Sequence, residues 1–188
     1  MEQGFYSEDE LSKLGLGSYG KNVLISKRCS LYGRSNIHIG NNVRIDDFCV
    51  LSAGEGIYIG NYVHIATHSL LMGSKVIKLK DFSGISSRVA VYSSSDDYSG
   101  HFMTNPTVSN SFTNVQSENV IIGRHAIIGS GSTILPGVHV GDGAAVLAMS
   151  LVTKNCDDFH AYFGIPAKKI KKRSNDLLKL EKEFLASI

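Results

Sequence analysis

Residues 120–154 read VIIGRHAIIGSGSTILPGVHVGDGAAVLAMSLVTK. An aliphatic residue returns at every sixth position of this stretch, at Ile122, Ile128, Ile134, Val140, Val146 and Val152. A helix repeats near 3.6 residues and a strand near 2, so neither explains this period by itself. A unit of one short flat side and one turn does explain it, because three such units close one triangular coil. We therefore predict an all-β solenoid with the aliphatic side chains pointing inward.

The same register continues upstream, with two slips of two residues each. It runs through Ile39, Ile45, Leu51, then Ile59, Ile65, Leu71, then Leu79, Ile85 and Val91. The pattern stops over residues 96–119, DDYSGHFMTNPTVSNSFTNVQSEN, and then resumes. A polar loop of this length inside a compact domain is usually functional or disordered. We expect the chemistry of the protein to lie at this interruption.

The chain divides into three parts on this reading. Residues 1–20 form an N-terminal segment with a short helix, residues 21–157 form the solenoid, and residues 158–188 form a tail. The tail should end in an α-helix capped by Ser174, with Glu181 on the solvated side. The apolar stripe of this helix should lie on the solenoid or on a neighbour and cover an exposed end.

The net charge, the apolar runs and the cysteine spacing of the chain exclude several classes of protein. A net charge of +2 over 188 residues gives no reason to expect a nucleic-acid partner. The chain starts with an acidic stretch rather than a signal peptide, and no run approaches the ~20 apolar residues of a membrane span. Cys29, Cys49 and Cys156 are widely spaced and form no CxxC pair, which favours reduced thiols and a cytoplasmic location.

The repeats together with GIPAKKIKKR at residues 164–173 resemble the hexapeptide-repeat acyltransferases. The resemblance is greatest to the galactoside, maltose and streptogramin O-acetyltransferases and to the sugar acetyltransferases of surface-polysaccharide synthesis. It implies a left-handed parallel β-helix and a homotrimer that binds acetyl-CoA in a cleft between adjacent subunits. It also implies a sugar acceptor that enters near the interrupting loop.

The resemblance assigns a coenzyme track along the last coils. By motif position, the coenzyme contacts are Ser130, Ala148, Thr153 and Lys154, and the basic residues that meet its phosphates are Lys168 and Lys171. Small side chains let a thin ligand approach the backbone, and ammonium groups pair with phosphate. On the competing interpretation, the small residues only fill corners and the lysines form a solvated face.

The catalytic base is harder to assign. The galactoside and maltose enzymes use a His at a position that falls at or next to Asp96 here, where this chain reads SSSDDYSGH. One explanation makes His101 the base, with Asp96 or Asp97 orienting its ring, since an imidazole titrates near working pH. The other makes the acceptor an amine, which attacks a thioester unaided while a carboxylate holds it and takes a proton late. The remaining alternative is that these residues only form a turn and a surface loop.

We place His68 and Tyr98 among the acceptor contacts, His68 because relatives have a polar acceptor-binding residue near its position. His64 and His68 form an HxxxH pair, which would bind zinc on a helix but does not converge on the sides of a β-helix. We therefore expect no metal.

The sequence thus predicts an acetyl-CoA-dependent acetyltransferase acting on a hydroxyl or amino group of a sugar or nucleotide sugar, in lipopolysaccharide or capsule synthesis. Two alternatives stay open. One is a detoxifying O-acetyltransferase for an antibiotic or free saccharide, and the other is a non-catalytic β-helix scaffold.

Overall fold

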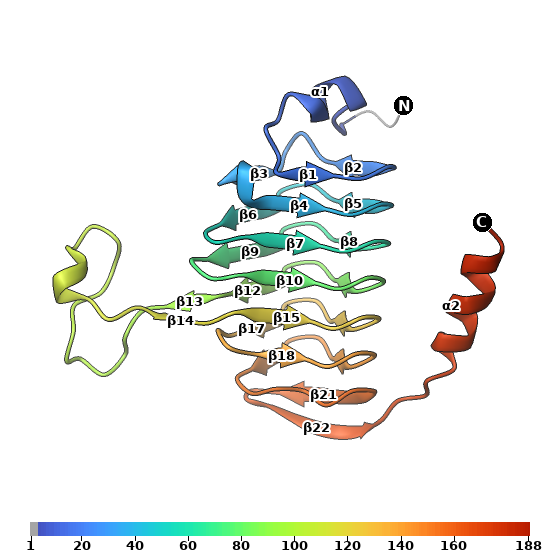
Figure 1. Ribbon diagram of the computed structural model, residues 1–188. Helices are drawn as coiled ribbons and strands as arrows, with labels where there is room; N and C mark the ends of the chain where they lie inside the picture. Colours follow the sequence, from blue (N-terminus) through green and yellow to red (C-terminus); the bar gives the residue numbers. More distant parts are fainter. Residues whose placement is uncertain (1–3) are drawn as a thin grey trace.

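A computed structural model describes residues 4–188, so residues 1–3 of the expected N-terminal segment lie outside the described residues. The chain forms a left-handed parallel β-helix with three walls (Figure 1). Wall 1 contains β1 (Ser18–Tyr19), β4 (Ile37–Ile39), β7 (Ile57–Ile59), β10 (Ile77–Leu79), β15 (Val120–Ile122) and β18 (His139–Val140). The all-β solenoid expected from the six-residue period is confirmed.

The other two walls are built from the strands that follow at each turn. Wall 2 contains β2 (Val23–Ile25), β5 (Val43–Ile45), β8 (His64–Ile65), β11 (Gly84–Ile85), β16 (Ile127–Ile128), β19 (Ala145–Val146), β21 (His160–Gly164) and β22 (Ala167–Lys172). Wall 3 contains β3 (Ser30–Tyr32), β6 (Val50–Ala53), β9 (Leu70–Gly73), β12 (Ala90–Tyr92), β17 (Thr133–Ile134) and β20 (Leu151–Val152). Strands within a wall pair in parallel, except that β22 turns back antiparallel to β21.

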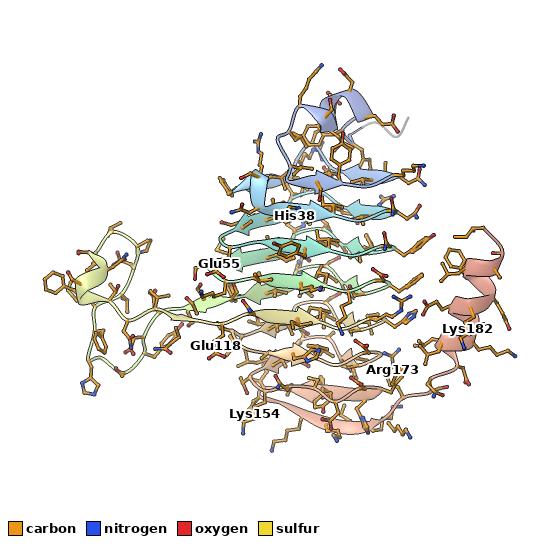
Figure 2. The ribbon with its side chains drawn as sticks, in the orientation of Figure 1. His38, Glu55, Glu118, Lys154, Arg173 and Lys182 are labelled. Carbon is orange, nitrogen blue, oxygen red and sulfur yellow. The ribbon has the colours of Figure 1, made fainter. Side chains whose placement is uncertain are left out.

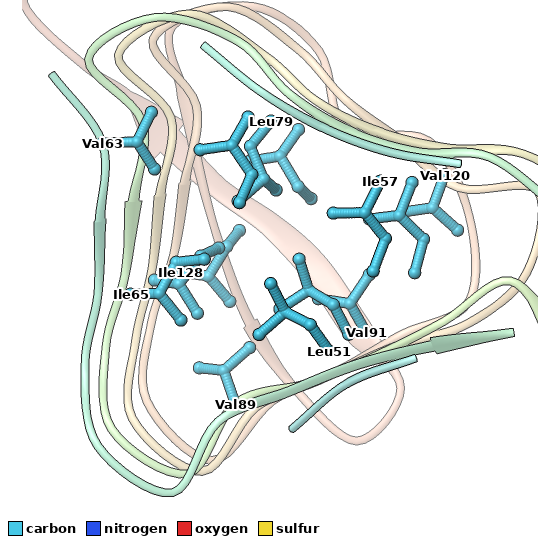
Figure 3. Close-up of a cluster of buried hydrophobic side chains, with 14 of the residues drawn as sticks. Leu51, Ile57, Val63, Ile65, Leu79, Val89, Val91, Val120 and Ile128 are labelled. Carbon is cyan, nitrogen blue, oxygen red and sulfur yellow. The ribbon is translucent and has the colours of Figure 1, made fainter. Parts of the chain in front are cut away.

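The core is a column of aliphatic side chains inside the triangular cross-section (Figure 3). Every inward residue predicted from residues 120–154 is at most 1% exposed. Parallel pairing places equivalent residues of successive coils directly above one another, as with Ile45, Ile65 and Ile85 in wall 2. This stacking buries each side chain against its counterparts, so the core is continuous from coil to coil.

Residues 96–115 leave the solenoid between walls 3 and 1 and stand clear of it (Figure 1). Two short antiparallel strands, β13 (Ser94–Ser95) and β14 (Gln116–Ser117), form the base of this excursion. It contains one 3₁₀ turn, η2 (Asn110–Phe112), and we call it the arm. A second such turn, η1 (Arg34–Asn36), lies in the first coils.

The two α-helices within the described residues lie at the periphery. The short N-terminal helix is α1 (Glu8–Ser12), and the C-terminal helix is α2 (Leu177–Ala186). Helix α2 runs alongside the solenoid rather than across its end (Figure 1), and Asp176 rather than Ser174 is its N-cap residue, so both of those expectations were wrong. Within residues 4–188, neither helix is long and apolar enough to span a membrane.

Glu181 attaches α2 to the corner between walls 1 and 2. Its carboxylate accepts hydrogen bonds from Arg124 (Nε, 3.2 Å) and pairs with the ring of His125 (2.6 Å). Phe184 adds edge contacts to the rings of Tyr62 and Phe82, 5.3 and 6.3 Å between centroids. The side chain of Glu181 is only 11% exposed, so the expectation that it faces solvent was wrong.

We predict that Glu181 makes the stability of the protein depend on pH in the acid range. Hydrogen bonding from Arg124 lowers its pKa from the ordinary 4.5 to about 2. Because the folded pKa is depressed, this contribution is present above about pH 4.5 and is lost as the pH falls towards 2. Glu181→Gln should therefore reduce the free energy of unfolding at pH 7 by about 1–3 kcal/mol and have less effect at pH 3.

Chemical denaturation at the two pH values measures this difference. Glu183→Gln, in the same helix but more exposed, is the matched control and should change little at either pH. An equal loss from both substitutions at pH 7 would contradict the role of the Glu181 contact.

Candidate active site

A cleft of about 780 Å³ lies where the arm meets wall 3. Strands β9, β12 and β17 supply its wall-side lining through Met72, Tyr92 and Thr133, and the arm supplies Asp96 and Tyr98. Its size falls within the usual range of ~300–1,000 Å³ for ligand sites. We call it the arm cleft.

Asp96 is the single charged side chain among the residues that line the arm cleft. Within the described part of the chain, its carboxylate makes no hydrogen bond to another residue, so both oxygens are available to a ligand. The neighbouring lining groups are hydroxyls, amides and aromatic rings, which orient a polar organic molecule. The cleft can thus bind an acceptor and offer one carboxylate to its reacting group.

Asp97 makes hydrogen bonds within the arm and does not line the cleft. Its carboxylate accepts hydrogen bonds from the backbone N–H (2.8 Å) and hydroxyl of Ser99 and from the amide of Asn114 (3.2 Å). These bonds, those from Ser99 first, hold the pKa of Asp97 below its ordinary value. His101 is exposed and does not line the cleft, so the structure does not bring it to Asp96.

The predicted coenzyme residues lie along both edges of wall 3 in its lower coils. Ser130 and Ala148 are at the corner between walls 2 and 3, where the Ser130 carbonyl accepts the Met149 N–H (2.9 Å). Thr153 and Lys154 follow β20 at the opposite edge, one coil below the end of β17, and Lys154 points outward (Figure 2).

The predicted phosphate-binding lysines are both on β22. Lys168 pairs across from Phe163, close to the corner that holds Ala148, and Lys171 pairs with Ala161 at the far end of the strand. Both side chains are exposed to solvent. Their roles, like those of the other coenzyme residues, remain predictions.

The two expected acceptor residues lie at opposite edges of wall 3. Tyr98 lines the arm cleft although it is 92% exposed. His68 is at the corner between walls 2 and 3, where its ring lies 4.9 Å from that of Phe48. His64 hydrogen-bonds to Asp46 (2.7 Å) instead of joining His68, and residues 4–188 contain no cluster of His, Cys, Asp or Glu that could hold a metal ion.

The three cysteines are free thiols, and none of them lines the arm cleft. Burial raises the pKa of Cys156 to about 12, so its thiol is a poor nucleophile.

Sequence reasoning missed the wall-side lining of the cleft. Met72, Tyr92 and Leu135 each follow directly after an inward aliphatic residue, so their side chains point out of wall 3. This position recurs in every coil, and checking it beside the interruption would have identified them.

The comparisons with known proteins agree with this architecture. The family model of the bacterial transferase hexapeptide (six repeats) matches residues 119–154. The dTDP-4-amino-4,6-dideoxy-D-glucose acyltransferase of Escherichia coli is 50% identical over 184 residues, covering 97% of this chain and 96% of the relative. The chloramphenicol acetyltransferase of Klebsiella aerogenes is 45% identical, but over only 58 residues, 31% of this chain and 28% of the relative.

Solved structures match over the whole chain as well. AntD, an N-acyltransferase from Bacillus cereus, was solved in complex with dTDP and 3-hydroxybutyryl-CoA and matches with a TM-score of 0.95 at 49% identity, covering 98% of this chain and 97% of that one. A single-substitution mutant of AntD, solved in complex with dTDP-4-amino-4,6-dideoxyglucose and coenzyme A, matches with a TM-score of 0.96 at 48% identity, covering 98% of this chain and 99% of that one. With half of its residues identical to a sugar acyltransferase from end to end, the chain belongs to the hexapeptide-repeat acyltransferases and is an acyl-CoA-dependent enzyme.

Proposed function

We propose that the protein transfers an acyl group from acyl-CoA to the amino group of a dTDP-linked amino sugar, dTDP-4-amino-4,6-dideoxyglucose or a close analogue. The observation that carries this proposal is the 50% identity to the Escherichia coli acyltransferase named for that substrate, which extends over 184 residues. The AntD complex with the same sugar nucleotide and coenzyme A supports it.

The composition of the arm cleft favours an amine over a hydroxyl as the acceptor. A sugar hydroxyl needs a general base, but no imidazole lines the cleft and the one charged group is the Asp96 carboxylate. A neutral amine is nucleophilic enough to attack a thioester without prior deprotonation. Asp96 then needs only to accept a hydrogen bond from the amine and to take a proton after attack, which is the second explanation drawn from the sequence.

The reaction is a direct transfer in a ternary complex. The lone pair of the amine forms a bond to the thioester carbonyl carbon, and the carbonyl π electrons move to oxygen. Collapse of the tetrahedral adduct breaks the C–S bond and leaves the amide. The proton lost by nitrogen passes through Asp96 to the sulfur of coenzyme A, so no covalent enzyme intermediate forms.

We further propose that coenzyme A runs along the lower coils past the six predicted residues, and that the active unit is a homotrimer with the site between subunits. The exposed positions of Lys168 and Lys171 suit pairing with coenzyme phosphates.

The free thiols are consistent with the cytoplasm as the location. In this setting the product would serve lipopolysaccharide or capsule synthesis.

Release of free thiol from acetyl-CoA, measured with a panel of acceptors, tests the proposed function. We expect turnover with dTDP-linked 4-amino sugars and none with the matched 4-hydroxy sugar nucleotides, free saccharides or chloramphenicol. Turnover only with hydroxyl acceptors would overturn the amine assignment. No turnover with any acceptor, together with no thermal shift on adding coenzyme A, would favour the scaffold alternative.

A further inference from the structure

The arm cleft lacks a positive charge that its proposed acceptor requires. A nucleotide sugar carries a diphosphate with two negative charges, and such groups are normally bound by Arg or Lys. Among the residues lining the cleft there is no Lys, Arg or His, and Asp96 adds a further negative charge. A cleft of this composition repels a diphosphate, so the site within one chain is incomplete.

Arg88, in the same coil as Tyr92 of the cleft, is a candidate for the missing charge. It lies two residues before β12 and Asp96 lies four residues after that strand, so the two residues are at opposite edges of wall 3 in the same coil. Arg88 is exposed, and no ion pair or side-chain hydrogen bond to a described residue engages its guanidinium. Arg28, which lies at the same corner three coils earlier, differs in this respect because it pairs with Asp47 (3.0 Å). Lys75, at the opposite edge of wall 3 one coil earlier, pairs with Glu55.

Arg88 also belongs to a column of exposed side chains at the corner between walls 2 and 3. Successive coils place Phe48, His68, Arg88, Gly131 and Met149 there, joined through backbone bonds such as Arg88 N–H to the Thr67 carbonyl (3.1 Å). Phe48 is 50% exposed and Met149 67% exposed, so apolar side chains flank the two polar ones. This column runs along the solenoid axis, which suits contact with a second solenoid lying parallel to the first.

The arm is the matching surface. Phe112 is 61% exposed, Met103 56% and Val115 49%, and the arm stands off its own solenoid (Figure 1). A ring of identical copies joins two different surfaces of each copy, and rotation about an axis parallel to the solenoid keeps each residue at its own height. The column of one copy can therefore meet the arm cleft of the next, with Arg88 level with Tyr92 and His68 level with Met72.

We propose that Arg88 of one copy completes the arm cleft of the adjacent copy and binds the diphosphate of the nucleotide sugar there. The proposal rests on the proposed function and adds the source of the missing charge. It makes Arg88 a substrate-binding residue rather than a catalytic one.

The first test is kinetic. Arg88→Ala should raise KM for the nucleotide amino sugar by about 10–100-fold, change kcat and KM for acetyl-CoA little, and leave the oligomeric state by light scattering unchanged. Arg88→Lys should recover part of the loss. Lys21→Ala, which removes an exposed cation at the corner between walls 1 and 2, is the matched control and should leave KM unchanged.

The second test is subunit mixing. Arg88→Ala and Asp96→Ala chains are co-expressed with different affinity tags, and the mixed oligomers are assayed at acceptor concentrations far below KM. If each site takes Asp96 from one copy and Arg88 from another, about a quarter of the sites in a random equal mixture contain both native residues. We expect activity near that fraction of the native enzyme, well above the sum of the two variants alone.

The outcomes separate this inference from the proposed function. If the native enzyme does not acylate the nucleotide amino sugar, the proposed function fails. If the native enzyme is active but Arg88→Ala leaves KM unchanged, Arg88 does not bind the diphosphate. If Arg88→Ala raises KM but mixing restores no activity, both residues act within one chain and the inference is overturned.

Discussion

Asp96→Ala is expected to lower kcat/KM for the amino-sugar acceptor by about 100- to 10,000-fold. The substitution removes the one charged group in the arm cleft, and with it the acceptor of the amine hydrogen bond and of the released proton. Folding should be little affected, because the Asp96 carboxylate makes no hydrogen bond to another described residue. Steady-state thiol release with acetyl-CoA in excess measures the change, and Asp96→Asn should resemble Asp96→Ala because an amide cannot take the proton.

His101→Ala is the matched control in the same arm. His101 is exposed and does not line the cleft, so its removal should change kcat/KM by less than about threefold. A loss from His101→Ala as large as that from Asp96→Ala would restore the imidazole-base explanation. If both variants keep full turnover, the arm supplies no catalytic group and the mechanism proposed here is wrong.

The largest effect on stability is expected from Ile65→Ala. Ile65 is fully buried in wall 2, directly between Ile45 and Ile85 of the adjacent coils. Because the coils above and below are fixed by backbone ladders, the space cannot collapse, and we expect a loss of about 2–5 kcal/mol in the free energy of unfolding. Chemical denaturation with Ile65→Val as control, expected to cost about 0.5–1.5 kcal/mol, measures it. A loss below about 1 kcal/mol for Ile65→Ala would mean that this core tolerates cavities.

The fold was predictable because one physical requirement repeats along the chain. Each coil must bury one aliphatic side chain per wall, so residues such as Ile122, Ile128 and Ile134 appear at a fixed spacing that no helix or ordinary strand produces. The interruption at residues 96–119 could be recognised because the six-residue spacing of inward aliphatic residues stops there. The left-handed winding came from the family resemblance and not from the spacing.

Helix α2 shows what the period could not predict. Asn41, Asn61 and Asp142 each accept the backbone N–H of the residue one coil above at the corner between walls 1 and 2. Arg124 occupies the equivalent position in its coil, but its guanidinium donates to the carboxylates of Asp81 and Glu181. Arg124 thus departs from the Asn and Asp ladder, and its partner carboxylate lies 57 residues later in the chain. A contact of this kind leaves no periodic signal in the sequence.

The site was predicted only in part for a similar reason. Asp96 and Asp97 are identical neighbours in the sequence, yet one faces the cleft and the other is held by Ser99 and Asn114. Which carboxylate is free depends on how the arm pairs at its base and turns, and on contacts that cross it. Sequence analysis did not single out Arg88. The cleft that Arg88 is proposed to complete belongs to another copy of the chain, and no pattern within one sequence can reveal such a contact.

The most direct test of the central claim is the structure of the product formed from dTDP-4-amino-4,6-dideoxyglucose and acetyl-CoA, determined by mass spectrometry and NMR. We predict a nucleotide sugar heavier by one acetyl group, with the new carbonyl bonded to the C4 nitrogen as an amide. An ester on a ring hydroxyl, or recovery of the sugar nucleotide unchanged while an unrelated acceptor is acetylated, would contradict the account.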